Sequence, residues 1–449
     1  MHLRRQAGFV IVVTLISAVA VLGGMSSVEA APTSPPGVPG SVQAVAGNRS
    51  ATVSWRASAS SGGGRVDRYR VTSRPGSYHC TTTGPTVCTV RGLANGAGYT
   101  FTVAAQVATG WSKPSSPSPA VIPGVRVGGH LFYPGADLAG ADLSGADLQH
   151  VDIEGADLKG ADLSGANLAH ADLLGVDLSG STLTLAMLTG ADLAYANLYD
   201  ASLEDTDLTK ADLRGATLTG VTSGGITTVP ARFPLGFRVV DRYLVGPGVD
   251  LAGVDLAGAD LTGVDLAGAD LTDDTLTDTD LTHADLFGAT TTGVISGGIT
   301  TVPAQFPLGF SVVDGYLVGP DADLSGADLA GADLAGGDYS KIDLAGANLS
   351  GANLSGASVV ISDLSSTDLS DADLSDASFL GSQLIHADLS GAKLAGAVLA
   401  GADVSNSDVE GADLTGANLA GVVSGGLSGT PASLPSGWTS VNGTLVPPS

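Results

Sequence analysis

A five-residue repeat runs through most of this chain. It is regular in residues 136–140, 141–145 and 146–150, which read ADLAG, ADLSG and ADLQH. Its leucine recurs, with few exceptions, through residues 138–218, 251–286 and 324–419. An α-helix would spread that leucine around its surface, and a strand would alternate it between two faces. The chain must therefore turn once per repeat. Four repeats then close a square coil, and stacked coils place each leucine on the one twenty residues later, which predicts a solenoid.

The composition supports a fold made of turns. The 449 residues include 64 Gly, and the 45 acidic residues are 41 Asp and 4 Glu. Asp and Gly are poor helix formers and are depleted from regular strands. The mean hydropathy is positive, which argues against a disordered acidic chain, because such chains have low hydrophobicity.

The repeat resembles that of the pentapeptide-repeat family over nearly all of residues 136–421. The resemblance implies an all-β fold, a right-handed quadrilateral β-helix in which the central leucine and the small residue two positions earlier point inward. Most inward positions hold Leu or Ala, and the tolerated exceptions are Ile153, Tyr339, Val359 and Phe379. Gly337 is expected to make room for the ring of Tyr339. Asp274 also falls on an inward position, where an unpaired charge is costly, so that coil either bulges or supplies a partner.

A longer repeat divides the solenoid into three modules. The sequence GGITTVP at residues 224–230 recurs at 297 and, in weaker form, at 425. Pentapeptide blocks are expected at residues 136–220, 249–293 and 322–421, and inserts at 221–248, 294–321 and 422–449. Each insert carries a hairpin signal between apolar runs, at Asp241-Arg242, Asp314-Gly315 and Asn442-Gly443. We interpret the inserts as caps over open coil edges, and the alternative is a ligand cleft. The short middle block is expected to stack on its neighbours.

The first thirty residues have the form of an export signal. Arg4 and Arg5 precede an apolar run at 7–22, and residues 28–30, Val-Glu-Ala, predict cleavage after Ala30. The alternative is an uncleaved anchor, although the run is short for a spanning helix. Residues 31–40 form a Pro-rich linker. These features predict a secreted or cell-surface protein.

Residues 41–123 are typical of a small β-sandwich. Alternating runs at 51–55, 69–72 and 99–104 predict strands. The segment resembles a fibronectin type III module through Trp55 and through Leu93, which lies six residues before Tyr99 as in a tyrosine corner. Residues 124–135 are expected to link this module to the solenoid.

The only two cysteines, Cys80 and Cys88, lie in this module. In an exported protein such a pair predicts a disulfide, and the alternative is two free buried thiols. The module shows no catalytic set, because its single acid is Asp67 and its one histidine, His79, is expected on a surface strand.

Charge is divided sharply along the chain. Residues 31–134 contain nine Lys and Arg residues and one acid, a net charge of +8, whereas residues 135–449 contain eight and 43, a net charge of −35. This asymmetry suggests two different partners or a contact within the chain.

Two sets of surface residues are candidate metal ligands. Asp152, Asp172, Asp192 and Asp212 are expected to form an outward column spaced by about 4.8 Å. A divalent cation would relieve their repulsion, but calcium sites need converging oxygens, which favours solvated surface charge. His150 and His170 are expected to stack on one face, as a transition-metal pair or, by preference, as ordinary surface histidines.

Three functions are compatible with these features. The favoured one is a non-catalytic exported scaffold, an acidic β-helix attached through the basic module to a cell-envelope polymer or an extracellular protein. The second is inhibition of a DNA-binding enzyme by mimicry of DNA, which the resemblance implies for some cytoplasmic relatives; with an export signal, no nucleic-acid target is expected. The third is an accessory role in polysaccharide degradation. No catalytic motif is present in the sequence, and no cofactor is expected beyond a divalent cation.

Overall fold

The computed structural model describes residues 34–60 and 65–448. The chain forms two compact units, and the boundary between them in the sequence falls between Ile122 and Pro123. The predicted export signal, residues 1–30, lies outside the described residues. No helix in the described ranges is long and apolar enough to cross a membrane.

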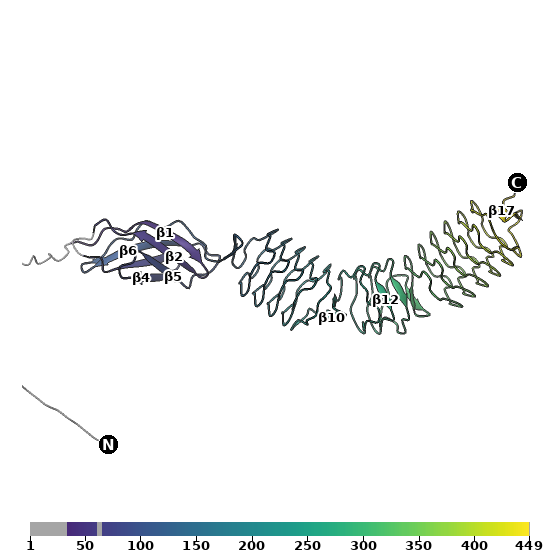
Figure 1. The fold of residues 1–449 in the computed structure, drawn as a ribbon, viewed down its shortest axis with the longest axis horizontal. Helices are drawn as coiled ribbons and strands as arrows, with labels where there is room; N and C mark the ends of the chain where they lie inside the picture. Colours follow the sequence, from purple (N-terminus) through teal and green to yellow (C-terminus); the bar gives the residue numbers. More distant parts are fainter. Residues whose placement is uncertain (1–33, 61–64, 449) are drawn as a thin grey trace, which may run out of the picture. The chain divides into compact units, whose positions relative to one another are not determined.

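The first unit is a β-sandwich (Figure 1). Its described strands are β1 (Gly40–Gly47), β2 (Ser50–Arg56), β3 (Arg68–Arg74), β4 (His79–Thr82), β5 (Val87–Arg91), β6 (Thr100–Val107) and β7 (Gly110–Trp111). One sheet has the order β1–β2–β5 and the other the order β4–β3–β6–β7. Leu93 is fully buried, and the Ala94 amide donates to the Tyr99 hydroxyl at 3.2 Å, which is the local geometry that the tyrosine-corner resemblance implies.

The second unit is a right-handed quadrilateral β-helix, seen in Figure 1 as a stack of coils. Parallel bridges join residues twenty positions apart, such as Asp137 with Asp157. The Leu138 amide donates to the Asp157 carbonyl at 2.7 Å, and the Asp157 amide donates to the Ala136 carbonyl at 2.9 Å. The corners lie in the left-handed region, with φ of 63° at Gly165, where glycine is favoured. One turn per repeat therefore explains the five-residue period.

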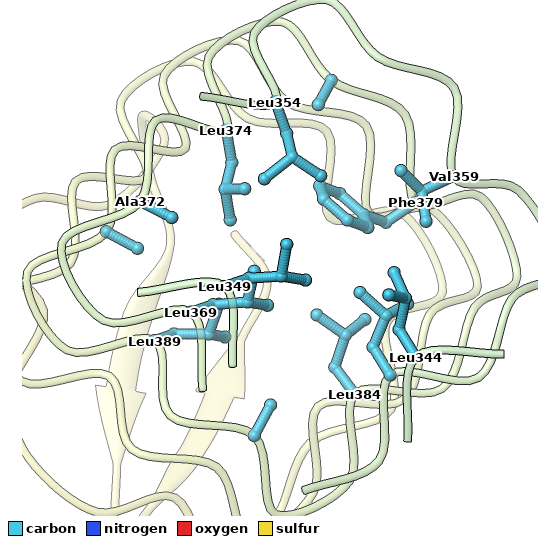
Figure 2. Close-up of a cluster of buried hydrophobic side chains, with 14 of the residues drawn as sticks. Leu344, Leu349, Leu354, Val359, Leu369, Ala372, Leu374, Phe379, Leu384 and Leu389 are labelled. Carbon is cyan, nitrogen blue, oxygen red and sulfur yellow. The ribbon is translucent and has the colours of Figure 1, made fainter. Parts of the chain in front are cut away.

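The coil interior is apolar, as the repeat predicts. Figure 2 shows Leu349, Leu369 and Leu389 in a row within it, and all three are at most 2% exposed. The four exceptions to Leu and Ala named above are also buried. A Cβ atom on Gly337 would overlap the Cζ and Oη atoms of Tyr339, so the expectation that this glycine makes room for the ring is confirmed.

The second unit also contains short strands. In its described residues they form four antiparallel hairpins and one parallel pair, β12 with β13, whose paired residues are twenty positions apart as in the rest of the coil wall. Their bounds are β8 (Val125–Val127), β9 (His130–Phe132), β10 (Arg238–Val240), β11 (Tyr243–Val245), β12 (Thr275–Thr277), β13 (Ile295–Gly297), β14 (Ser311–Val313), β15 (Tyr316–Val318), β16 (Thr439–Val441) and β17 (Thr444–Val446).

The coil continues through the first two inserts. Thr222 pairs in parallel with Asp250, and Ile295 pairs with Asp323, so each step spans 28 residues instead of twenty. In the hairpin of β10 and β11, Leu244 is buried with the core before it and Val245 with the core after it. The first hairpin therefore joins two successive cores as well as covering them.

Residues 124–135 are not the simple linker that the sequence suggested. They contain the hairpin of β8 and β9, in which Phe132 is fully buried in the first core and Val127 packs against it. The expectation was wrong because the first coil also needs an apolar cover. The sequence does contain an indication of this hairpin, because residues 130–138, HLFYPGADL, correspond to residues 243–251, YLVGPGVDL, which include the second strand of the first insert's hairpin.

Candidate functional site

The acidic column lies on one wall of the first block. Parallel bridges join Asp152 to Asp172, Asp172 to Asp192 and Asp192 to Asp212. The next residue in the column is Arg232, whose guanidinium lies 3.0 Å from the Asp212 carboxylate, as does that of Arg214. Both arginines are more than half exposed, so these ion pairs contribute little to stability. The column is thus a straight row that ends in positive charge.

His150 and His170 lie at corners of two successive coils, on the same edge of the β-helix. The rings of His150 and His170 stack with centroids 5.2 Å apart and planes 8° from parallel. Both corners have φ of 58°. Among the residues that the structure describes, no group of three or more His, Cys, Asp and Glu residues could hold a metal ion.

Asp274 is a buried acid with one hydrogen-bonding oxygen. Its side chain is fully buried, and the Val254 amide donates to its Oδ1 atom at 2.8 Å. Its Oδ2 atom has no hydrogen-bond partner. Burial raises the pKa of Asp274 to about 7, against the effect of the Val254 amide, and the charges of Asp270 and Asp250 raise it further. The sequence predicted either a bulge or a partner for Asp274, and the backbone amide of Val254 in the neighbouring coil is that partner.

A surface hollow of about 390 Å³ lies where the first insert meets the second block. Glu204, Asp205, Asp250 and the ring of Tyr243 contribute to its lining, which contains no His, Cys, Lys or Arg. The carboxylate of Asp205 lies over the Cα atom of Gly225 in the next coil, where an added Cβ would overlap its Oδ1 atom. The hollow is acidic and lacks the contrasting groups that general acid–base catalysis uses.

Three arginines line one sheet of the sandwich. Arg68, Arg70 and Arg74 of β3 are exposed on the outer face, alternating with buried residues of the core. The guanidinium carbon of Arg70 lies 4.5 Å from the centroid of the Trp111 ring on β7, in cation–π geometry. The ion pairs found in the described ranges all lie in the solenoid. The three arginines therefore present their charge to solvent.

A disulfide joins the two sheets of the sandwich. Cys80 on β4 is bonded to Cys88 on β5, and these strands belong to different sheets. The predicted pairing is confirmed, and the alternative of two free thiols is wrong. Disulfides persist in oxidising compartments.

Removing this disulfide should destabilise the sandwich selectively. The bond closes a short loop, with a sequence separation of 8 residues, and loop-closure entropy then gives about 2.5 kcal/mol. We expect Cys80→Ser/Cys88→Ser to lower the sandwich transition in calorimetry and to leave the solenoid transition unchanged. Equal melting of the wild-type sandwich with and without reductant would contradict this.

Two protein families account for most of the described chain. The family model for pentapeptide repeats matches eight times, over residues 135–165, 146–184, 161–194, 186–222, 250–290, 322–358, 362–399 and 392–422. This chain belongs to the pentapeptide-repeat family. The family model for the fibronectin type III domain matches residues 34–121. No curated protein shows a significant match to the chain.

Solved pentapeptide-repeat structures resemble parts of the chain. HetL, involved in heterocyst differentiation regulation in the cyanobacterium Nostoc sp. strain PCC 7120, is 26% identical over 64% of this chain and 93% of its own, with a TM-score of 0.19. A protein of the Arabidopsis thaliana thylakoid lumen is 31% identical over 21% and 66%, with a TM-score of 0.21. Full-length QnrB1, a plasmid-mediated fluoroquinolone resistance protein, is 17% identical over 61% and 91%, with a TM-score of 0.11.

The sequence anticipated the residues of the acidic surface but not the arrangement of the basic one. Alternation of Arg68 and Arg70 with buried residues was visible in the chain. The stacking of Arg70 on Trp111 was not, because it depends on β6 pairing with both β3 and β7.

Proposed function

We propose that this pentapeptide-repeat protein is a non-catalytic exported interaction protein. Its fibronectin type III module attaches an acidic β-helix to the cell envelope or to an extracellular partner. The observation that carries the proposal is the separation of charge: a net +8 over residues 31–134 against −35 over residues 135–449. Opposite charges on two compact units favour different partners for each unit.

The disulfide and the surfaces support this proposal. A disulfide between Cys80 and Cys88 suits an oxidising compartment outside the cytoplasm. The acidic column and the acidic hollow offer repeated carboxylates without a nucleophile and base in contact, which suits binding better than catalysis. Mimicry of DNA is the second candidate, since the solenoid is strongly acidic, but a cytoplasmic target would meet this protein only before export.

The test is sedimentation with isolated envelopes of the cells that produce the protein. The full chain is compared with residues 123–449, which form a compact unit with cores of their own. We expect only the full chain to pellet, and we expect salt to release it, because exposed charge pairs are screened. Pelleting of both proteins would place the attachment on the solenoid. Pelleting of neither would contradict attachment to the envelope.

A further inference from the structure

On one face of the fibronectin type III module, three arginines lie on a single strand. Outward residues on a strand are about 7 Å apart, so Arg68 and Arg70 are neighbours on β3, with Arg74 further along the same row. On the opposite sheet, Arg91 pairs with Ser50, at the other end of β2 from Arg56. Those two arginines are therefore about 20 Å apart and lie on two different strands, whereas the three arginines of the row share one strand.

The arginine row is flanked by hydroxyl groups. Four of the outward neighbours of the row on β3, β4 and β6 are threonines, Thr72, Thr81, Thr100 and Thr102, and the others are His79, Ala104 and Gln106. At one end of the row, Arg68 lines a surface hollow of about 460 Å³ together with Thr81, Thr83 and Pro85. Guanidinium groups match carboxylates in planar, two-bond geometry, and threonine hydroxyls both donate and accept hydrogen bonds. The face thus combines sites for acidic groups with sites for hydroxyl groups.

We propose that the outer face of the β4–β3–β6–β7 sheet binds a linear polysaccharide that bears carboxylate groups. This inference rests on the proposed function and names the ligand class of its attachment module. Charge complementarity supplies the attraction. The stacking of Arg70 on Trp111 holds one guanidinium in place, which reduces the side-chain entropy lost on binding.

A nucleic acid fits this face less well. Proteins that bind single strands stack the bases on exposed aromatic rings. Among the described outward residues of this sheet, the aromatic rings are His79 and Trp111, and the Arg70 guanidinium already covers one side of Trp111. Double-stranded DNA is read by an element that enters a groove, whereas the arginine row lies along a strand within the sheet.

The test measures binding of the full chain to polygalacturonate by calorimetric titration at low salt. Arg68→Gln/Arg70→Gln/Arg74→Gln removes the row. Arg49→Gln/Arg56→Gln/Arg91→Gln removes the same charge from elsewhere on the module and serves as the matched control. We expect the first variant to bind roughly tenfold more weakly, from the loss of three exposed charge contacts, and the control to bind within about twofold of the wild type. Unchanged melting of both variants establishes that the fold is intact.

Each other outcome overturns the inference at a defined point. Equal weakening of both variants would show that net charge, and not this face, binds the polymer. Equal binding of neutral dextran would show that carboxylate groups are not needed for recognition. Binding of duplex DNA without binding of polygalacturonate would show that the ligand is a nucleic acid and not an acidic polysaccharide. If the full chain pellets with envelopes but does not bind polygalacturonate, this inference fails and the proposed function stands.

Discussion

Replacing Gly337 by alanine should lower the free energy of unfolding of the solenoid by about 2–3 kcal/mol, the upper range for overpacking a core. Gly337 occupies an inward position of the third block, and an added Cβ would overlap the ring of Tyr339. That ring is 7% exposed, so it cannot move aside without leaving the core. Urea denaturation followed by far-ultraviolet circular dichroism measures the loss.

A second substitution on the same coil provides the control. Gly337→Ala/Tyr339→Leu recreates the pair found one repeat earlier, Ala332 and Leu334, which are both buried. We expect the double variant to be more stable than Gly337→Ala. Tyr339→Leu alone should also be destabilised, because it leaves space beside Gly337. The two changes should therefore be strongly non-additive. A double variant no more stable than Gly337→Ala would contradict the proposed fit between glycine and ring.

The fold of the solenoid was predictable because its five-residue period matches neither the 3.6-residue period of a helix nor the two-residue period of a strand. A residue such as Phe379 could be placed inside the coil by counting alone, and it is fully buried beside Val359 of the preceding coil (Figure 2). The hairpin over residues 125–132 was missed because it lacks the five-residue period and shares only part of its sequence with the inserts. Counting residues along the repeat locates the coils, but a hairpin outside the repeat is recognised only from the packing of its side chains in the structure.

The candidate surfaces were predictable to different degrees. The column that contains Asp172 and Asp192 follows from a spacing of twenty residues, and parallel bridges join these residues. Its termination by Arg232 does not follow, because Arg232 lies in an insert whose path the repeat does not set. The arginine row lies on a sheet whose strand order, β4–β3–β6–β7, is not sequential. Local alternation shows which residues point outward, but pairing decides which of them are neighbours.

Replacing Asp274 by asparagine should stabilise the solenoid near and above neutral pH. The pKa of Asp274 is raised by burial to about 7 in the folded chain, whereas an unfolded aspartate titrates near 3.9. Between those values the folded state binds a proton that the unfolded state has lost. The contribution of Asp274 to the free energy of unfolding is therefore fully present below about pH 4. It falls by about 1.4 kcal/mol per pH unit as the pH rises to 7, and it does not change further above pH 7. The measurement is urea denaturation of wild type and variant at several pH values.

The difference between wild type and Asp274→Asn isolates this one group. Hydrogen bonds from threonine side chains lower the pKa of Asp260 and Asp280, so these acids lose stabilising interactions below about pH 4 in both proteins alike. Thr279, the inward residue one repeat after Asp274, donates to the Leu256 carbonyl at 3.0 Å. By the same register, we expect the side-chain amide of an asparagine at position 274 to donate to the Leu251 carbonyl. Asp255→Asn, on the exposed wall of the preceding coil, should leave the pH slope intact. A wild type and Asp274→Asn that differ equally at pH 4 and pH 8 would show that Asp274 does not titrate between them.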